Sequence, residues 1–113
     1  MPKPTPLELR KYNIDQIILK ELSDLESRTI LFSMVNSSKL PSQIAYENKI
    51  PLSTVYKKIC KLKSLGLIHV EKIELINRKK SRFYRSNILE AEICIRKFEP
   101  IINLIKNNII IKE

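Results

Sequence analysis

The sequence holds one glycine, one histidine and two cysteines in 113 residues, and each scarcity excludes a class of site. A single glycine, Gly66, cannot build the glycine-rich loops that cradle nucleotide phosphates. A single histidine, His69, excludes the common histidine-based metal clusters and disfavours a Ser-His-Asp arrangement. The sequence therefore predicts no enzyme, no cofactor and no metal site.

Cysteine and long apolar runs are equally scarce. Cys60 and Cys94 lack metal-site spacing, and we expect two reduced, buried or half-buried thiols, with oxidant or soft-metal sensing as the alternative. No apolar run approaches the ~18 residues of a membrane span, and residues 1–6 lack the apolar core of a signal peptide. The sequence predicts a cytoplasmic protein that makes no membrane contact.

The length suits one domain. Residues 1–6 include three prolines and are predicted to form a flexible N-terminal arm before a single domain over residues 7–113. Apolar residues at helical spacing predict a first helix within residues 7–22. Ser23 followed by Glu26 predicts a capping box, which begins a buried second helix that ends near Val35.

Two further helices carry clear start and stop signals. Pro41 in a first turn predicts a third helix over Pro41–Asn48, with Ile44 and Ala45 facing inward. After a tight turn at Lys49 and Ile50, a fourth helix is predicted over residues 52–65. Gly66 closes it, because glycine adopts the left-handed conformation most readily.

Strand-like segments follow the fourth helix. Residues 67–76 and 81–86, joined by a polar turn at 77–80, predict a hairpin. The apolar alternation changes phase between Val70 and Ile73, so the hairpin has either a bulge near Lys72 or a two-sided first strand.

The end of the chain is predicted to form one more strand and a short helix. Residues 88–98 alternate apolar and polar side chains, which favours a strand. Pro100 predicts the start of a terminal helix. The apolar side of this helix would comprise Ile101, Leu104, Ile105 and Ile109.

The positive charge is concentrated in one stretch. Residues 49–85 carry eleven lysines and arginines against two acids, Glu71 and Glu74, which equals the net charge of +9 of the whole chain. The flanking residues 1–48 and 86–113 are each neutral. A positive field that runs from a helix into a hairpin is typical of a surface that meets a polyanion.

The fourth helix separates its residues onto two faces. At 100° per residue, Val55, Ile59 and Leu62 share one narrow sector that must face the core. Tyr56 and Lys58 lie on the flanks, placed for contacts to a nucleic-acid backbone. Small hydroxyl and cationic side chains can enter a major groove and approach base edges. They form the opposite face, which comprises Ser53, Thr54, Lys57, Lys61 and Ser64.

Residues 40–68 resemble winged helix-turn-helix transcriptional regulators of the ArsR/MarR-like group. The resemblance rests on the pair Ile44 and Ala45, the run Ser53-Thr54-Val55-Tyr56 and the ending at residues 62–68, and it covers about residues 26–86. It implies an α+β winged helix with a three- to four-helix core and a β-hairpin wing. The sequence adds the C-terminal strand and short helix.

The resemblance also implies a regulator that binds double-stranded DNA. The helix at residues 51–65 would enter the major groove, and the wing at about residues 77–82 would meet the backbone or minor groove. Members of this group usually act as homodimers, and spare apolar surface on the first helix and on residues 101–111 would supply the interface. The predicted DNA contacts are Ser53, Thr54, Tyr56, Lys57, Lys58, Lys61, Arg78, Lys79, Lys80 and Arg82.

Two other functions fit the same residues. The winged helix can be a protein-interaction subunit of a transcription or other complex, with its basic strip solvated or facing an acidic partner. It can also be an RNA-binding module. Tyr56, Phe83 and Tyr84 could stack on bases, but aromatic residues in a short hairpin more often pack between strands and helices, and we make no prediction that they stack. The sequence predicts no effector.

Overall fold

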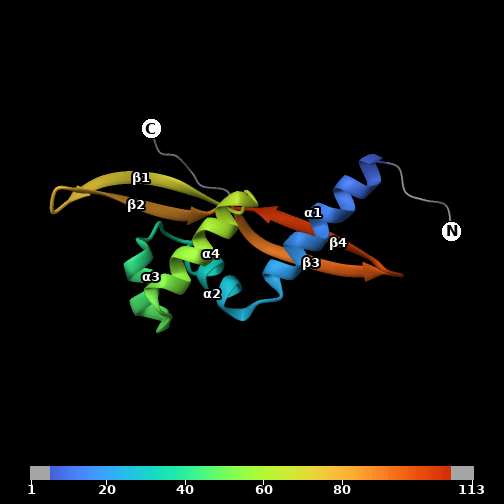
Figure 1. The fold of residues 1–113 in the computed structure, drawn as a ribbon, viewed down its shortest axis with the longest axis horizontal. Coiled ribbons are helices and arrows are strands. Elements are labelled where there is room, and N and C mark those ends of the chain that lie inside the picture. Colours follow the sequence, from blue (N-terminus) through green and yellow to red (C-terminus); the bar gives the residue numbers. More distant parts are fainter. Residues whose placement is uncertain (1–5, 108–113) are drawn as a thin grey trace.

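The computed structural model describes residues 6–107, with side chains from Ile14 onward, and places four helices between two hairpins that extend in opposite directions (Figure 1). The described chain spans 59 × 36 × 21 Å. None of its helices is long and apolar enough to cross a membrane. The elements are α1 Pro6–Leu22, α2 Leu25–Ser33, α3 Pro41–Asn48, α4 Leu52–Ser64, β1 Ile68–Ile76, β2 Lys79–Ser86, β3 Ile88–Arg96 and β4 Glu99–Lys106.

The first helix lies where the sequence predicts it. Pro6, which the sequence assigns to the N-terminal arm, is the first residue of α1. The rest of the predicted arm lies outside the described residues.

α2 lies at the centre of the core. Its Ile30 and Leu31 are fully buried, as is Met34 just after it, and α1, α3 and α4 all contact it. Full burial of one such side chain contributes about 1.5–3 kcal/mol. The predicted burial of the second helix is confirmed, although α2 ends at Ser33 rather than near Val35.

The start of α2 differs from the predicted capping box. Asp24 is the N-cap residue, and its carboxylate accepts a hydrogen bond from the Ser27 backbone N–H at 3.0 Å. The Ser23 hydroxyl instead donates to the Lys20 carbonyl at 2.6 Å. The capping box of Ser23 and Glu26 is therefore wrong, because Ser23 bonds back to the helix that precedes it.

The ends of α3 and α4 match their sequence signals. Pro41 begins α3, and the predicted turn after it lies at Lys49, whose φ of 55° is left-handed. Gly66 follows α4 with a φ of 75°. The Leu67 N–H then donates to the Leu62 carbonyl at 3.0 Å, which is the closing bond of a Schellman motif.

β1 and β2 form the predicted hairpin, hereafter the wing. The register shifts between Val70 and Lys72, so Glu71 is a bulge, and of the two alternatives the bulge is confirmed. The turn has only two residues, Asn77 and Arg78, both with positive φ, as in a type I′ turn. The predicted turn over residues 77–80 is too long, because this tight turn lets β2 begin at residue 79.

The C-terminal segment is a second hairpin. β3 confirms the strand predicted within residues 88–98. The predicted terminal helix is wrong, because β4 takes its place and pairs antiparallel with β3. In this strand Ile102 and Leu104 are half-buried against the core. The predicted helix would have turned Ile101 inward in place of Ile102. Ile109 lies outside the described residues.

Pro100 fits this strand because of where its missing N–H would point. A two-residue turn pairs Arg96 with Glu99, and the next pair is Ile95 with Pro100. In an antiparallel ladder hydrogen-bonded and non-hydrogen-bonded pairs alternate, so Pro100 falls in a pair that needs no donor. Pro100 is buried, and it costs the β3–β4 ladder no hydrogen bond.

Both cysteines are exposed and free, so the prediction of buried or half-buried thiols is wrong. Alternation along β3 explains Cys94, because Ala91 and Ile93 occupy the opposite face. Cys60 follows the buried Ile59 on α4 and lies on its outer side.

Replacing Gly66 with alanine is expected to lower the free energy of unfolding by about 1–2 kcal/mol, because a left-handed φ disfavours a Cβ atom. An added Cβ would meet no atom within 4 Å, so backbone strain is the whole effect. Gly66→Asn should lose less, since asparagine tolerates this conformation. Denaturant unfolding of the three proteins measures the difference, and equal stability of wild type and Gly66→Ala would contradict it.

Candidate nucleic-acid interface

α4 divides into the inner and outer faces that its sequence predicts. Val55, Ile59 and Leu62 are 0 %, 2 % and 0 % exposed and lie in the core. The outer face is exposed except for the half-buried Thr54, so its hydroxyl and ammonium groups can reach a partner. The other members of this face are Ser53, Lys57, Cys60, Lys61 and Ser64.

The two flanks of α4 meet different neighbours. Tyr56 is 53 % exposed and turns toward the wing. Lys58 lies on the opposite flank and forms an ion pair with Asp24 at 2.8 Å. This hydrogen-bonded pairing raises the pKa of Lys58 and lowers the pKa of Asp24 from 3.8 to about 2. Lys58, predicted as a DNA-backbone contact, thus has its charge balanced within the chain.

The predicted wing cations are exposed and unpaired. Arg78 lies in the turn, and Lys79, Lys80 and Arg82 lie in β2. Of the eleven basic residues in the stretch 49–85, three form ion pairs, which leaves eight with no acidic partner within 4.0 Å among the described residues. The three paired residues are Lys58, Lys72 and Arg85.

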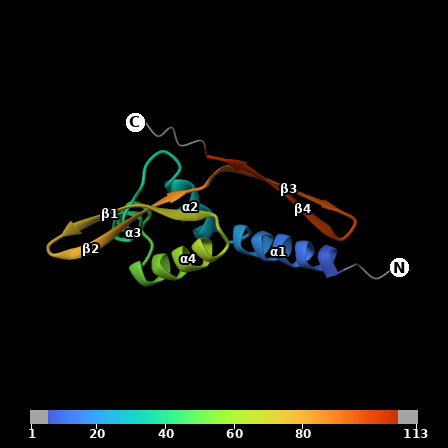
Figure 2. The same cartoon turned by 90° about the horizontal axis from the view of Figure 1, so that it is seen from above.

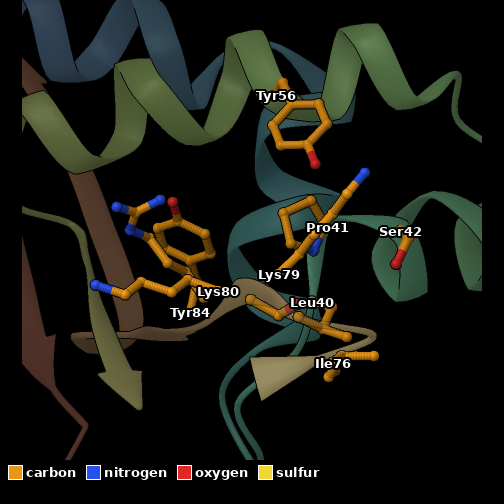
Figure 3. A pocket seen from close by; sticks show the side chains of 10 residues that line it. Leu40, Pro41, Ser42, Tyr56, Ile76, Lys79, Lys80 and Tyr84 are labelled. Carbon is orange, nitrogen blue, oxygen red and sulfur yellow. The ribbon is translucent and has the colours of Figure 1, made fainter. Parts of the chain in front are cut away.

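A cleft of about 330 Å³ lies between α4, the start of α3 and the wing (Figure 3). Tyr56 forms its α4 side, and its hydroxyl points into the space. Leu40 and Pro41 contribute from the start of α3, and the basic residues Lys79, Lys80 and Arg82 contribute from the wing. Tyr56 on the flank of α4 and the wing cations therefore face one cleft, and no lysine of α4 lines it.

The wing is fixed at its base by backbone and side-chain contacts. Lys39 and Tyr84 exchange two backbone hydrogen bonds of 2.9 Å. The Arg85 guanidinium donates to the Val35 carbonyl at 3.2 Å and forms an ion pair with the bulged Glu71 at 3.2 Å. These contacts hold the wing at a defined angle to the helices.

Four other side chains of the hairpin make contacts within the chain. His69 lies in β1, as predicted, and its Nδ1 is hydrogen-bonded with the Asn87 side chain. Lys72 lies over the Phe83 ring, 4.5 Å from its centroid, and Tyr84 packs on the core. The expected packing is therefore confirmed for Tyr84, whereas Phe83 contacts Lys72 and Tyr56 is 53 % exposed.

Two residues of this surface were not singled out by the sequence. Lys63 is exposed and unpaired near the end of α4, and the concentration of charge in residues 49–85 was its only signal. Ser42 lines the cleft. No sequence signal marks Ser42, because its position depends on how the segment before α3 meets β2.

Comparison with solved structures identifies the fold. One similar structure is the homodimeric winged helix-turn-helix DNA-binding domain, fragment 1–100, of Mb0332 from Mycobacterium bovis, described as a possible ArsR-family transcriptional regulator. It has 19% sequence identity, covers 76% of this chain and 75% of that chain, and gives a TM-score of 0.59. NolR from Sinorhizobium fredii has 17% identity, covers 76% and 81% of the two chains, and gives 0.61.

No protein-family model and no curated protein sequence matches the chain. At these identities the solved structures show the fold alone. The α+β winged helix predicted from residues 40–68 is confirmed, with β4 in place of the terminal helix.

Removing the ion pair of Lys58 should lower the melting temperature by a few degrees near neutral pH. Asp24→Asn is the informative variant, because asparagine keeps the N-cap acceptor and loses the charge. The folded-state pKa of Asp24 lies at about 2, below its ordinary 3.8, so this stabilisation is complete above about pH 4 and is lost toward about pH 2. Thermal unfolding of Asp24→Asn, Lys58→Met and wild type should show gaps that close over this range. Gaps that persist at pH 2 would contradict the assignment.

Proposed function

We propose that this protein is a homodimeric transcriptional regulator that binds double-stranded DNA, with α4 in the major groove and the wing on the adjacent backbone or minor groove. The observation that carries the proposal is that Tyr56, on the flank of α4, and the unpaired wing cations Lys79, Lys80 and Arg82 line one cleft. The description of Mb0332 as a homodimeric DNA-binding domain supports it.

Each part of the surface has a distinct role in this proposal. Ser53, Thr54, Lys57 and Lys61 approach base edges, since short hydroxyl side chains and lysine ammonium groups match groove acceptors. Phosphate contacts position the protein without reading sequence. They come from Tyr56, Arg78, Lys79, Lys80 and Arg82. Lys58 acts indirectly, through the ion pair that orients α4 on α2.

The dimer interface is proposed on α1 and the β3–β4 hairpin, which leave the core on the side away from the wing (Figure 2). Ile14 continues the helical stripe of the buried Ile18 and Leu22 but is 49% exposed. Ile93 and Ile95 share the β3 face that packs toward the core and are also exposed. Apolar patches of this kind mark interaction sites. A second copy would cover them and set two α4 helices about 34 Å apart on a palindromic site.

Binding to a duplex selected from a random pool should weaken with salt at a slope of about −3.6 per subunit in log K against log salt, for the four wing cations at phosphates. The double variant Lys57→Glu and Lys61→Glu should lose at least about tenfold in affinity, because both lysines approach base edges. Anisotropy titrations over a salt series measure both quantities.

The matched control is Lys20→Glu with Lys97→Glu, which changes the net charge equally at exposed positions outside α4 and the wing. These residues lie on α1 and in the β3–β4 turn, so the control is titrated at a protein concentration at which sedimentation shows it to be dimeric. Its duplex affinity should stay within about twofold of wild type. Equal losses in the two double variants would reject the α4 surface, and preference for RNA at equal salt would favour the RNA-binding alternative.

The chain of 13.3 kDa is expected to sediment at twice this mass at tens of micromolar. Ile14→Asp combined with Ile95→Asp should give a folded monomer, because both side chains are exposed in the single chain and a carboxylate would oppose their burial in a dimer. Ile73→Asp on the wing, also exposed, should stay dimeric. A monomeric wild type, with or without duplex, would remove this interface.

A further inference from the structure

The outer edge of β2 offers backbone groups that no strand uses. The two-residue turn makes Ile76 and Lys79 the first hydrogen-bonded pair of the wing, and in an antiparallel ladder such pairs alternate with non-hydrogen-bonded ones. Ser81 is the next hydrogen-bonded position. Lys80 and Arg82 lie between these positions, so their N–H and C=O groups point away from β1.

A third strand begins on this edge and stops after one residue. Lys39 pairs antiparallel with Tyr84, and two residues further along this register Pro41 would face Arg82. Proline has no N–H to donate, and here it begins α3 and carries the chain away from β2. Within residues 6–107, the outward N–H and C=O groups of Arg82 and Lys80 therefore have no backbone partner.

The cleft of about 330 Å³ runs beside this edge, where the third strand would have continued. Its lining mixes apolar side chains, such as Leu40 and Pro41, with the cations Lys79, Lys80 and Arg82, and it includes no acidic residue. An unpaired sheet edge in a groove of this composition suits an extended chain whose side chains alternate between apolar and negatively charged.

We propose that the β2 edge binds an extended acidic segment of a partner protein, which adds as a strand beside Arg82 and Lys80. The backbone of this segment completes the ladder that Lys39 begins. Its carboxylates face the wing cations, and its apolar side chains pack against Leu40, Pro41 and the Tyr56 ring in the cleft.

A peptide fits this edge better than a nucleic-acid strand for a chemical reason. The phosphates and sugars of DNA accept hydrogen bonds but donate none, so they leave the outward carbonyls of Arg82 and Lys80 unsatisfied. A peptide backbone supplies both donors and acceptors at the spacing of a strand. The cleft also lies at the small end of ligand pockets, which matches a short extended segment.

Amide hydrogen exchange followed by NMR tests the proposal directly, with a ten-residue peptide of alternating aspartate and valine as the probe. In the protein without peptide, the Lys80 and Arg82 amides should exchange rapidly, while the Ser81 amide, which lies in the β1 ladder, should exchange slowly. Saturating peptide should slow exchange at Lys80 and Arg82 by at least about tenfold. A peptide of alternating lysine and valine should leave both unchanged.

Two changes, one in the protein and one in the probe, remove backbone hydrogen bonds between β2 and the peptide and leave the charges of the probe unchanged. Arg82→Pro deletes the outward N–H, and Arg82→Ala is its control, because alanine loses the same charge and keeps the donor. Arg82→Pro should bind the acidic peptide about fivefold to tenfold more weakly than Arg82→Ala, which is the effect of one hydrogen bond. The second change leaves the protein intact and compares two probes, one N-methylated at its odd-numbered residues and one at its even-numbered residues. One of these two probes should lose binding and the other should keep it.

Unchanged exchange at Lys80 and Arg82 under saturating peptide would overturn the proposal. Equal binding of the two methylated probes would also overturn it, because affinity would then come from charge alone. Protection of these two amides by duplex DNA and not by the peptide would assign the cleft to the nucleic acid. These outcomes do not depend on whether α4 binds DNA, which the charge variants test separately.

Discussion

The C-terminal end of α2 is the constraint on which the arrangement of the rest depends. Met34 caps α2 and Val35 follows it, and the carbonyl groups of both residues accept hydrogen bonds from the hairpins. The Ser86 N–H donates to the Met34 carbonyl at 3.1 Å, where β2 ends. The Val35 carbonyl accepts from Arg85 of β2 and, at 2.8 Å, from Asn107 just after β4. The wing and the C-terminal hairpin are thus anchored to the most buried helix of the molecule.

Features of the fold that depend on neighbours in sequence could be predicted, and those that depend on distant pairing could not. Pro41 and Gly66 act within their own turns, so α3 and α4 have the expected ends. The spacing of Ile101 and Leu104 fits a helix and a strand equally well locally. Pairing with β3 decides between them, and no local signal contains that information. The phase change before Ile73 indicated a bulge but needed the partner strand to locate it.

The candidate site follows the same division. The inner and outer faces of α4 follow from helical geometry alone, which explains why Val55 is buried and Lys57 exposed as expected. Lys58 lies at the border of those faces, and its partner Asp24 belongs to another helix, so the ion pair could not be read from spacing. The open edge of β2 could not be predicted either, because it is recognised only from the backbone pairing of Lys39 with Tyr84. Composition indicated a basic surface, and only tertiary contacts separated its paired charges from its unpaired ones.

The bulge at Glu71 constrains how the length of this hairpin can change among related chains. Side chains alternate between the two sides of a strand, so one extra residue turns the outer part of β1 over and brings Ile73 and Leu75 to the side of Tyr84. If Glu71 were instead paired in regular alternation, Lys72 would take their side. Residues added in equal numbers to both strands beside the turn would lengthen the wing and leave its present pairs unchanged, whereas an odd total would require a longer turn or a second bulge. Among related chains, the number of residues in the wing should therefore differ by even numbers.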